Sequence, residues 1–230
     1  MQSGTDNNGS TELLADLAII DGSGVEGIGV EASAPVNADF YNAADYFIDR
    51  NIREGRGEKT AVICEDRSCS YSEIQQGVNR FGNLLKTLDV RLEERVALLM
   101  LDTEYFPQAF FGAIKLGAVP VCLNTMMRPK DYLYFLNDSR ARVLVVDAAL
   151  KEQIDAIEGE LHFLQHVIVA NSDPDQATQR RNPVAKTASS SKQPSPLSLA
   201  EAMSGQSDQL ETALTTRDDA CFWLYSSGTT

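Results

Sequence analysis

Residues 95–123 read RVALLMLDTEYFPQAFFGAIKLGAVPVCL, a stretch in which the pattern of apolar residues changes twice. After the opening arginine, the next six residues are continuously apolar up to the aspartate, which predicts a strand buried on both faces. The stretch after Thr103 instead carries large apolar residues at helical spacing and ends at Gly117, a residue suited to a helix end. Residues 119–123 return to an uninterrupted apolar run. Strand, helix and strand in this order predict a right-handed crossover between parallel strands.

The same alternation continues on both sides of this unit. Before it, the sequence predicts an amphipathic helix over residues 42–54 and a hairpin of two short strands over residues 61–71. A second helix is predicted over residues 72–88, and it opens with a capping-box pattern at residues 72–75. After it, we expect a helix, a strand, a helix and a strand, over residues 129–136, 142–146, 150–157 and 167–170. Strands that alternate with helices at these intervals predict an α/β fold, with a mostly parallel sheet flanked by helices.

The chain divides by composition into four segments. Residues 1–36 are rich in Gly, Ser, Asn and acidic residues and carry no Lys or Arg, which predicts a flexible acidic tail. Residues 37–170 hold the alternating elements and are expected to form one α/β subdomain. Residues 171–198 are rich in Ser, Thr, Gln and Pro, a composition typical of an exposed linker or loop. A short helix and an apolar strand at 220–225 then begin the next subdomain, over residues 199–230.

Charge and composition argue against several functional classes. The 230 residues carry a formal net charge of −13 and are 43% hydrophobic. An acidic chain without clustered Lys and Arg is not expected to bind nucleic acid or an anionic membrane. No apolar run approaches the ~20 residues that span a bilayer, and no secretory signal opens the sequence. Because Cys64, Cys69, Cys122 and Cys221 lack CxxC spacing, we expect reduced thiols in a cytoplasmic protein and no structural zinc.

The last ten residues, 221–230, read CFWLYSSGTT and carry the leading candidate site. Here an apolar strand delivers five residues rich in hydroxyl groups and glycine: Ser226, Ser227, Gly228, Thr229 and Thr230. Glycine lets the backbone turn back on itself, and its neighbours offer N–H and O–H donors to an anion. In open α/β sheets, ligands collect at the carboxyl ends of strands. The pattern therefore predicts a phosphate cradle, although it is not a Walker loop because no Gly-Lys-Ser/Thr follows.

Two other patterns indicate different chemistry, but their surroundings do not support it. Gly22 to Gly27 matches G-x-G-x-x-G, the dinucleotide-binding fingerprint, but Pro35 interrupts the stretch in which the required helix must begin. His162 and His166 are four residues apart, as in some metal sites, yet no acidic ligand accompanies them in H-E-x-x-H form. The glycine pattern is better interpreted as part of a glycine-rich tail, and the two histidines are better interpreted as part of a helix-to-strand junction.

Several segments together resemble the adenylate-forming superfamily, the acyl-CoA synthetases or AMP-binding enzymes. Residues 225–230, YSSGTT, are similar to the first half of the superfamily's phosphate-loop signature, which continues Gly-x-Pro-Lys-Gly. Five further segments match the superfamily in order and spacing: residues 60–62, 71–74, 95–97, 110–120 (FFGAIKLGAVP) and 123–125 (LNT). Residues 40–46 and 132–142 look most like benzoate-CoA ligases.

The resemblance implies the N-terminal portion of the adenylate-forming ligase fold, incomplete because the signature stops at Thr230. In that family a carboxylate attacks the α-phosphate of Mg-ATP, giving an acyl-adenylate and pyrophosphate, and the thiol of coenzyme A then displaces AMP. Residues 226–230 would hold the β- and γ-phosphates. By the same resemblance, Leu224 and Tyr225 would border the pocket for a small aromatic carboxylate. No catalytic residue and no metal ligand can be assigned among the 230 residues.

The sequence leaves two alternatives open. The chain could be a non-catalytic α/β module that binds a nucleotide or a protein partner, or it could belong to another acyl-CoA synthetase of the same superfamily. In either case, the final strand at residues 220–225 is expected to have unpaired edges through which chains can associate.

We expect the purified 230-residue chain to form no acyl-CoA, because this sequence does not contain the residues that the family uses after the phosphate loop. The measurement is pyrophosphate release in the presence of benzoate, ATP and coenzyme A. Release at the level of a chain-free blank is the expected result, and turnover by the 230-residue chain would contradict it.

Overall fold

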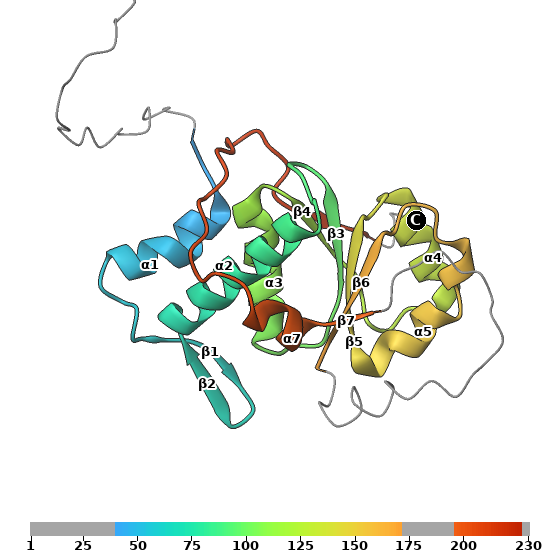
Figure 1. The fold of residues 1–230 in the computed structure, drawn as a ribbon, viewed down its shortest axis with the longest axis horizontal. Helices are drawn as coiled ribbons and strands as arrows, with labels where there is room; N and C mark the ends of the chain where they lie inside the picture. The colour runs from blue at the N-terminus through green and yellow to red at the C-terminus, as the bar shows by residue number, and fades with distance from the viewer. Residues whose placement is uncertain (1–39, 172–195, 227–230) are drawn as a thin grey trace, which may run out of the picture. The chain divides into compact units, whose positions relative to one another are not determined.

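The central sheet of the described residues has six strands in the order β7-β6-β5-β3-β4-β8, and each neighbouring pair is parallel (Figure 1). The strands are β3 (Arg95–Leu99), β4 (Val119–Cys122), β5 (Val143–Asp147), β6 (His166–Ala170), β7 (Leu197–Ser198) and β8 (Trp223–Leu224). They belong to a computed structural model that describes residues 40–171 and 196–226. The predicted α/β fold with a mostly parallel sheet is confirmed.

Three of the predicted segments extend beyond the described residues. The acidic tail (1–36), most of the linker (171–198) and the end of the phosphate cradle (227–230) lie outside them. The division of the chain into subdomains therefore stays a prediction. None of the helices in the described residues combines the length and the apolar character that crossing a membrane requires.

Helices cover both faces of the sheet, and Figure 1 shows the two groups to the left and right of the strands. On one face lie α2 (Tyr71–Thr87), α3 (Tyr105–Leu116) and α7 (Leu199–Ser204), and on the other lie α4 (Pro129–Asp138) and α5 (Lys151–Asp155). The shorter turns are η1 (Asp45–Asp49), α1 (Arg50–Arg53), η2 (Ala148–Leu150) and η3 (Glu158–Glu160). The predicted hairpin is confirmed as the antiparallel pair β1 (Thr60–Cys64) and β2 (Arg67–Ser70).

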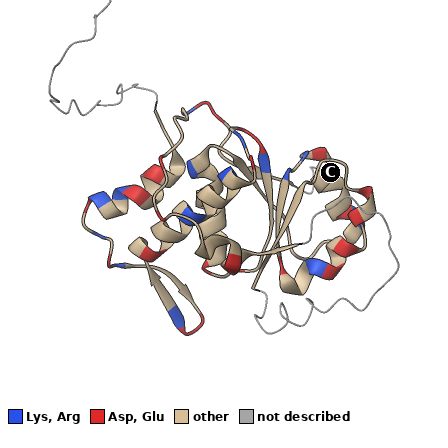
Figure 2. Cartoon of the chain, in the orientation of Figure 1, with Lys and Arg blue, Asp and Glu red and all other residues tan. Residues whose placement is uncertain are grey.

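The inner strands of the sheet are apolar on both sides, as strands covered by helices must be. In β3, Val96 and Leu98 pack with α2 and α3, whereas Ala97 and Leu99 pack with α4 and α5. All five residues of β5 are buried. Figure 2 shows the consequence for charge: the strands are mostly tan, and Lys, Arg, Asp and Glu gather on helices and loops. This distribution explains why the run at residues 95–101 shows no alternation.

The capping box of α2 lies two residues before its predicted position at residues 72–75. Ser70 is the N-cap: its Oγ accepts a hydrogen bond from the Glu73 N–H at 3.3 Å, and its own N–H donates to Glu73 Oε2 at 2.7 Å. The hydrogen bonds that the Ser70 N–H and Oγ–H donate to the Glu73 carboxylate lower the pKa of Glu73. The box needs a hydroxyl three residues before the acidic residue, and Ser70 satisfies that spacing whereas Ser72 lies within the first turn.

Helices α2 and α3 approach each other closely because a glycine stands where they meet. A Cβ atom at Gly112 would lie 2.8 Å from the Val78 carbonyl oxygen and 2.9 Å from the Phe81 ring. Any larger residue at this position would separate the helices. Gly112, the first of the two glycines in FFGAIKLGAVP, is therefore required by helix packing.

A buried ion pair joins η1 to α3. Lys115 Nζ donates to Asp49 Oδ1 at 2.9 Å and to Asn79 Oδ1 at 2.7 Å, and lies 2.8 Å from Asp49 Oδ2. Gln75 donates a further hydrogen bond to Asp49 at 2.7 Å. Lys115 and Asp49 are 3% and 7% exposed. Burial of two charges costs solvation free energy, and the dense hydrogen bonding offsets that cost only while both partners are present.

We expect Lys115→Met to lower the free energy of unfolding by about 3–5 kcal/mol, because it leaves the buried Asp49 carboxylate without its cation. Urea denaturation followed by circular dichroism measures the change. Arg91→Met is the matched control: Arg91 pairs with Asp89 on the surface, so its loss should cost about 0–1 kcal/mol. Equal losses in the two variants would show that the buried pair does not hold the fold together.

Candidate functional site

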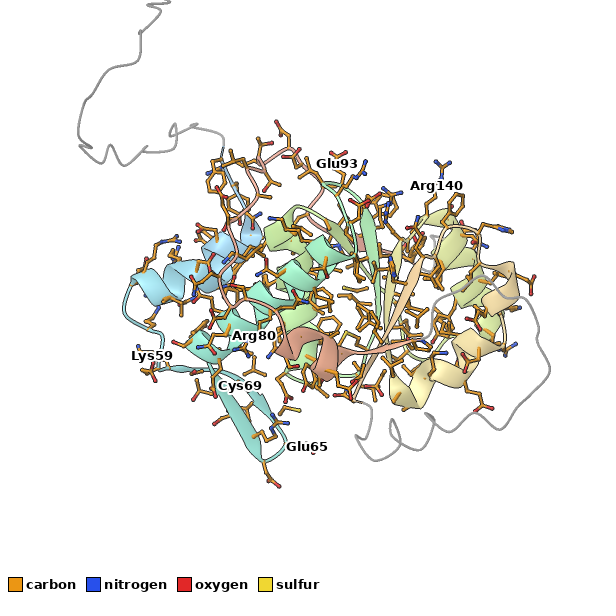
Figure 3. The ribbon with its side chains drawn as sticks, in the orientation of Figure 1. Lys59, Glu65, Cys69, Arg80, Glu93 and Arg140 are labelled. Carbon is orange, nitrogen blue, oxygen red and sulfur yellow. The ribbon has the colours of Figure 1, made fainter. Side chains whose placement is uncertain are left out.

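The carboxyl ends of parallel strands lie at one edge of a sheet, and the sheet has a topological switch point beside β3. The chain leaves β3 through α3 to reach β4 on one side, and then passes through α4 to reach β5 on the other side. Ligands of open α/β sheets bind outside the strand ends at such a point. Figure 3 labels Glu93 and Arg140, which precede β3 and β5, toward the opposite, amino end of these strands.

A polar cluster that the sequence did not reveal lies at the carboxyl ends of β3, β5 and β6. Asp147, 3% exposed, accepts hydrogen bonds from the Ala149 N–H at 3.0 Å and from Asn171 Nδ2 at 2.6 Å. Asn171 Nδ2 also lies 3.5 Å from Thr103 Oγ1. The sequence does carry one signal of this cluster, because Asp147 is an acidic residue at the end of an apolar strand. Its hydrogen bonds mainly fasten the three strand ends to one another.

Two other buried polar groups at this edge, the Glu104 carboxylate and the Tyr132 hydroxyl, have structural partners. Glu104, beside the first turn of α3, is 6% exposed and lies 2.5 Å from Arg67 of the β1–β2 hairpin. The loop after β4 is fastened by Tyr132, whose hydroxyl donates to the Asn124 carbonyl at 3.0 Å and accepts from the Met127 N–H at 3.2 Å. Both groups shape the surroundings of the strand ends.

The candidate phosphate cradle follows β8, which is bound to the sheet by a short parallel pairing. Trp223 pairs with Val121 and Leu224 pairs with Cys122, so the carboxyl end of β8 lies beside that of β4. Ser226 is exposed and is the only residue of the cradle that the structure describes. Ser227, Gly228, Thr229 and Thr230 lie outside the described residues.

Two aromatic side chains attach β8 to the α4 side of the sheet. The Arg95 guanidinium lies over the Trp223 ring, 5.8 Å from its centroid. The Tyr225 hydroxyl donates to Asp138 Oδ2 at 2.8 Å, and its ring centroid lies 4.4 Å from that of Phe135. Burial, together with the Asp138 carboxylate, raises the pKa of Tyr225. The Tyr225 side chain thus reaches from the end of β8 toward the last turn of α4, which lies on the amino side of β5.

Leu224 and Tyr225, the predicted borders of a substrate pocket, face opposite sides of β8. Tyr225 packs with the α4 and α5 core, whereas Leu224 pairs with Cys122, which packs with the α2 and α3 core. Leu224 is 66% exposed. The Tyr225 hydroxyl is already bonded to Asp138, so only its ring remains to contact a ligand.

An irregular segment brings the chain to β8, and side-chain amides fix its path. Over residues 206–216, Asn79 Nδ2 donates to the Asp208 carbonyl at 2.7 Å, and Asn83 Nδ2 donates to the carbonyls of residues 207 and 209 at 2.8 and 2.9 Å. Asn42 Nδ2 donates to Thr215 Oγ1 at 3.2 Å. We call residues 206–216 the return segment. Two hollows of the surface lie along it, away from the carboxyl ends of the strands.

The two disfavoured patterns contribute nothing to this site. Gly22 to Gly27 lies outside the described residues. His166 begins β6, and His162 lies in the preceding turn, so the two do not share a helix face. Within the described ranges, no group of three or more His, Cys, Asp or Glu residues gathers as a metal site would require.

Comparison with known proteins identifies the family to which this arrangement corresponds. The model of the AMP-binding enzyme family matches residues 48–230. The benzoate–CoA ligase of Thauera aromatica is 40% identical over 191 residues, which are 83% of this chain and 32% of that enzyme. The 4-hydroxybenzoate–CoA/benzoate–CoA ligase of Rhodopseudomonas palustris is 38% identical, over 83% of this chain and 32% of that enzyme. The chain thus spans about a third of the length of these curated relatives.

Solved structures agree. An anthranilate CoA ligase in complex with anthranoyl-AMP superposes with a TM-score of 0.71 and 37% identity, over 83% of this chain and 33% of that one. A benzoate CoA ligase from Burkholderia xenovorans LB400 gives a TM-score of 0.64 and 35% identity, over 80% of this chain and 32% of that one.

We expect the free energy of unfolding to fall above pH 10, partly because of Tyr225. Its pKa in the folded state lies above the ordinary 10.0, so the folded chain retains a proton that the unfolded chain releases. Tyr225→Phe should make this fall smaller, and at neutral pH it should cost about 1 kcal/mol for the lost hydrogen bond. Urea denaturation at about pH 8 and about pH 11 measures both effects. Tyr46→Phe, at an exposed position, is the control. If the free energy of unfolding falls between these two pH values as steeply in Tyr225→Phe as in Tyr46→Phe, the hydrogen bond from Tyr225 to Asp138 is not formed.

Proposed function

The chain belongs to the AMP-binding enzyme family, and from that premise we propose that it forms part of an aryl-CoA ligase. Such an enzyme uses ATP to join an aromatic carboxylic acid to coenzyme A. The 40% identity to the Thauera aromatica benzoate–CoA ligase across 83% of the chain carries the proposal. The other relatives reported above are also named for benzoate, 4-hydroxybenzoate or anthranilate, which supports an aromatic acid as substrate.

In the proposed reaction, a carboxylate oxygen attacks the α-phosphorus of ATP. The bond between the α-phosphorus and the bridging oxygen breaks, and pyrophosphate leaves with the electron pair. The sulfur of coenzyme A then attacks the acyl carbon, its proton is lost, and AMP leaves. Negative charge builds on pyrophosphate in the first step, so donors fixed beside the β- and γ-phosphates lower the barrier.

We assign those donors to the residues that follow β8. The hydroxyls of Ser226, Ser227, Thr229 and Thr230, with the backbone N–H groups among them, would hold the β- and γ-phosphates, and Gly228 would allow the turn. The described start of this segment supports the assignment, because Ser226 is exposed at the end of a parallel strand. The attachment of Tyr225 to Asp138 would limit the freedom of the first loop residue.

The aromatic substrate is proposed to lie near Leu224 and Tyr225. Leu224 offers an exposed apolar side chain, and Tyr225 offers a ring whose hydroxyl is satisfied by Asp138. Apolar contact with an aromatic ring and few polar groups is the usual composition of such a pocket. Because the two side chains face opposite sides of β8, we expect one of them to dominate the contact.

The magnesium ion that accompanies ATP in this family is assigned to none of the described residues. These residues contain no group of three or more potential acidic, histidine or cysteine ligands, and the cradle offers neutral hydroxyl oxygens. When bound, the ion would neutralise phosphate charge. No step above depends on a residue that holds it.

A chimera tests the proposal: this chain replaces the matched 191-residue stretch of the Thauera aromatica ligase. We expect the folded chimera to form benzoyl-CoA and to release one pyrophosphate for each benzoyl-CoA. In the chimera, Thr229→Ala should lower kcat/KM for ATP by about 10- to 100-fold through loss of a phosphate donor. Ser204→Ala is the control, because its hydroxyl bonds the Glu201 carbonyl at the surface of α7.

Two outcomes would overturn the proposal. A folded chimera that releases no pyrophosphate with any benzoate or hydroxybenzoate would contradict the aryl-CoA ligase assignment. Equal kinetics of Thr229→Ala and Ser204→Ala would contradict the role of the cradle and leave the family membership untouched.

A further inference from the structure

The carboxyl end of helix α4 is fastened to the amino end of the sheet. Ser139, which follows the helix, is 1% exposed, and its hydroxyl donates to the Phe135 carbonyl at 2.7 Å. The Ser139 carbonyl accepts a hydrogen bond from Arg95 Nε at 2.7 Å. Arg95 Nη1 also donates to the Glu93 carbonyl at 2.9 Å, just before β3. The end of α4 is therefore a fixed point of the structure.

Two aromatic side chains attach β8 and the residue after it to this fixed point. Trp223 and Tyr225 are two residues apart in an extended segment, which places them on the same face of the strand. The Arg95 guanidinium that bonds the Ser139 carbonyl lies over the Trp223 ring. The Tyr225 hydroxyl donates to Asp138, the residue before Ser139. The α4 end thus contacts this face at two places.

The Tyr225 side chain is held along its whole length. Its ring centroid lies 4.4 Å from that of Phe135 and 6.3 Å from that of Tyr134, and its hydroxyl is 2.8 Å from Asp138 Oδ2. A side chain fixed at both ring and hydroxyl leaves little freedom to the Cα that carries it. Ser226, the first residue of the candidate cradle, follows that Cα directly.

An aspartate is an unfavourable residue at the place where Asp138 stands. It is the last residue of α4, and the carboxyl end of a helix carries partial negative charge, which repels a carboxylate. No Lys or Arg lies in the last turn, and none of the ion pairs among the described residues includes Asp138. The stability of α4 therefore does not explain this carboxylate, whereas its contact with Tyr225 does.

Strand β8 needs such an attachment because its own pairing is short. Two residue pairs bind it to β4, and a ladder of that length does little to fix the direction in which the chain leaves the strand. Groups that bind a ligand must be held to within about 0.5 Å by the residues that support them. The contact of Tyr225 with Asp138 acts at the residue where the loop begins.

We propose that Asp138 is a positioning residue for the phosphate loop. Through Tyr225 it holds Ser226 where the loop can bind the β- and γ-phosphates of ATP. Asp138 itself makes no contact with a substrate and takes no part in the bond changes. The role in ATP binding rests on the proposed function, whereas the attachment of β8 to α4 can be measured without any reaction.

Tryptophan fluorescence of the 230-residue chain tests the attachment. Trp223 is the only tryptophan of the sequence, so quenching of its fluorescence by acrylamide reports on β8 alone. We expect Asp138→Ala to raise the quenching constant by at least about 1.5-fold, and Asp138→Asn, which keeps an acceptor oxygen, to change it by less than about 1.2-fold. Asp155→Ala is the matched control, because Asp155 pairs with Lys151 within α5, and it should leave the constant unchanged.

Kinetics of the Thauera aromatica chimera test the effect on ATP. We expect Asp138→Ala to raise KM for ATP by about 3- to 10-fold, the equivalent of one hydrogen bond. KM for coenzyme A should change by less than about twofold, because the thiol reacts after pyrophosphate has left. Asp138→Asn should restore KM for ATP. Tyr225→Phe removes the same bond, so Asp138→Ala should add no further increase in the Tyr225→Phe background.

Three results count against Asp138 as a positioning residue. Unchanged quenching in Asp138→Ala would show that the carboxylate does not hold β8. Increased quenching with KM for ATP unchanged would show that the loop does not depend on the attachment. A lower kcat with KM for ATP unchanged would assign Asp138 to folding alone. If Asp138→Ala does not fold, Tyr225→Phe takes its place in both measurements, because it keeps the ring.

Failure of the proposed reaction would give a different result. A chimera that releases no pyrophosphate even with Asp138 in place contradicts the aryl-CoA ligase assignment, and the quenching of Trp223 in the 230-residue chain is unaffected by that outcome. An active chimera in which Asp138→Ala and Asp155→Ala have the same KM for ATP contradicts the positioning role and leaves the reaction intact.

Discussion

The parallel pairing of β8 with β4 is the constraint on which the candidate site depends. Only two residues of each strand take part, Trp223 with Val121 and Leu224 with Cys122. Such a short ladder is weak by itself. Two contacts reinforce it from the α4 side: the Arg95 guanidinium lies over the Trp223 ring, and the Tyr225 hydroxyl donates a hydrogen bond to Asp138. Hydrogen bonds from Asn79 and Asn83 fix the return segment that leads to the strand. The hydroxyl-rich loop thus begins at a defined place because several weak contacts act on one short strand.

The same elements that hold this strand also hold the fold. Asn79 bonds the return segment through its amide nitrogen and Lys115 through its amide oxygen. Lys115 in turn bonds Asp49 of η1. One buried polar network therefore couples η1, α2, α3 and the path of the chain to β8. A network of this kind stabilises only when every member is satisfied, so its residues cannot be exchanged one at a time without loss.

The sequence was informative wherever local pattern and burial agree. Residues 95–123 predicted a strand, a helix and a parallel strand because both strands are buried on both faces. The start of α2 was predicted two residues late, because both Ser70 with Glu73 and Ser72 with Gln75 fit the capping-box spacing, and the structure forms the first pair. Nothing local indicates that Asp147 bonds Asn171 or that Tyr225 reaches Asp138, because those contacts join segments far apart in the sequence.

We propose above all that the residues after β8 form the phosphate loop of an AMP-binding enzyme. Hydrogen–deuterium exchange of the chimera, with and without a non-hydrolysable ATP analogue, tests it most directly. We expect slowed exchange in the peptide that covers residues 224–230, with the amino ends of β3 and β5 unchanged. Protection elsewhere in the chain, with residues 224–230 exchanging at the same rate in both states, would contradict it.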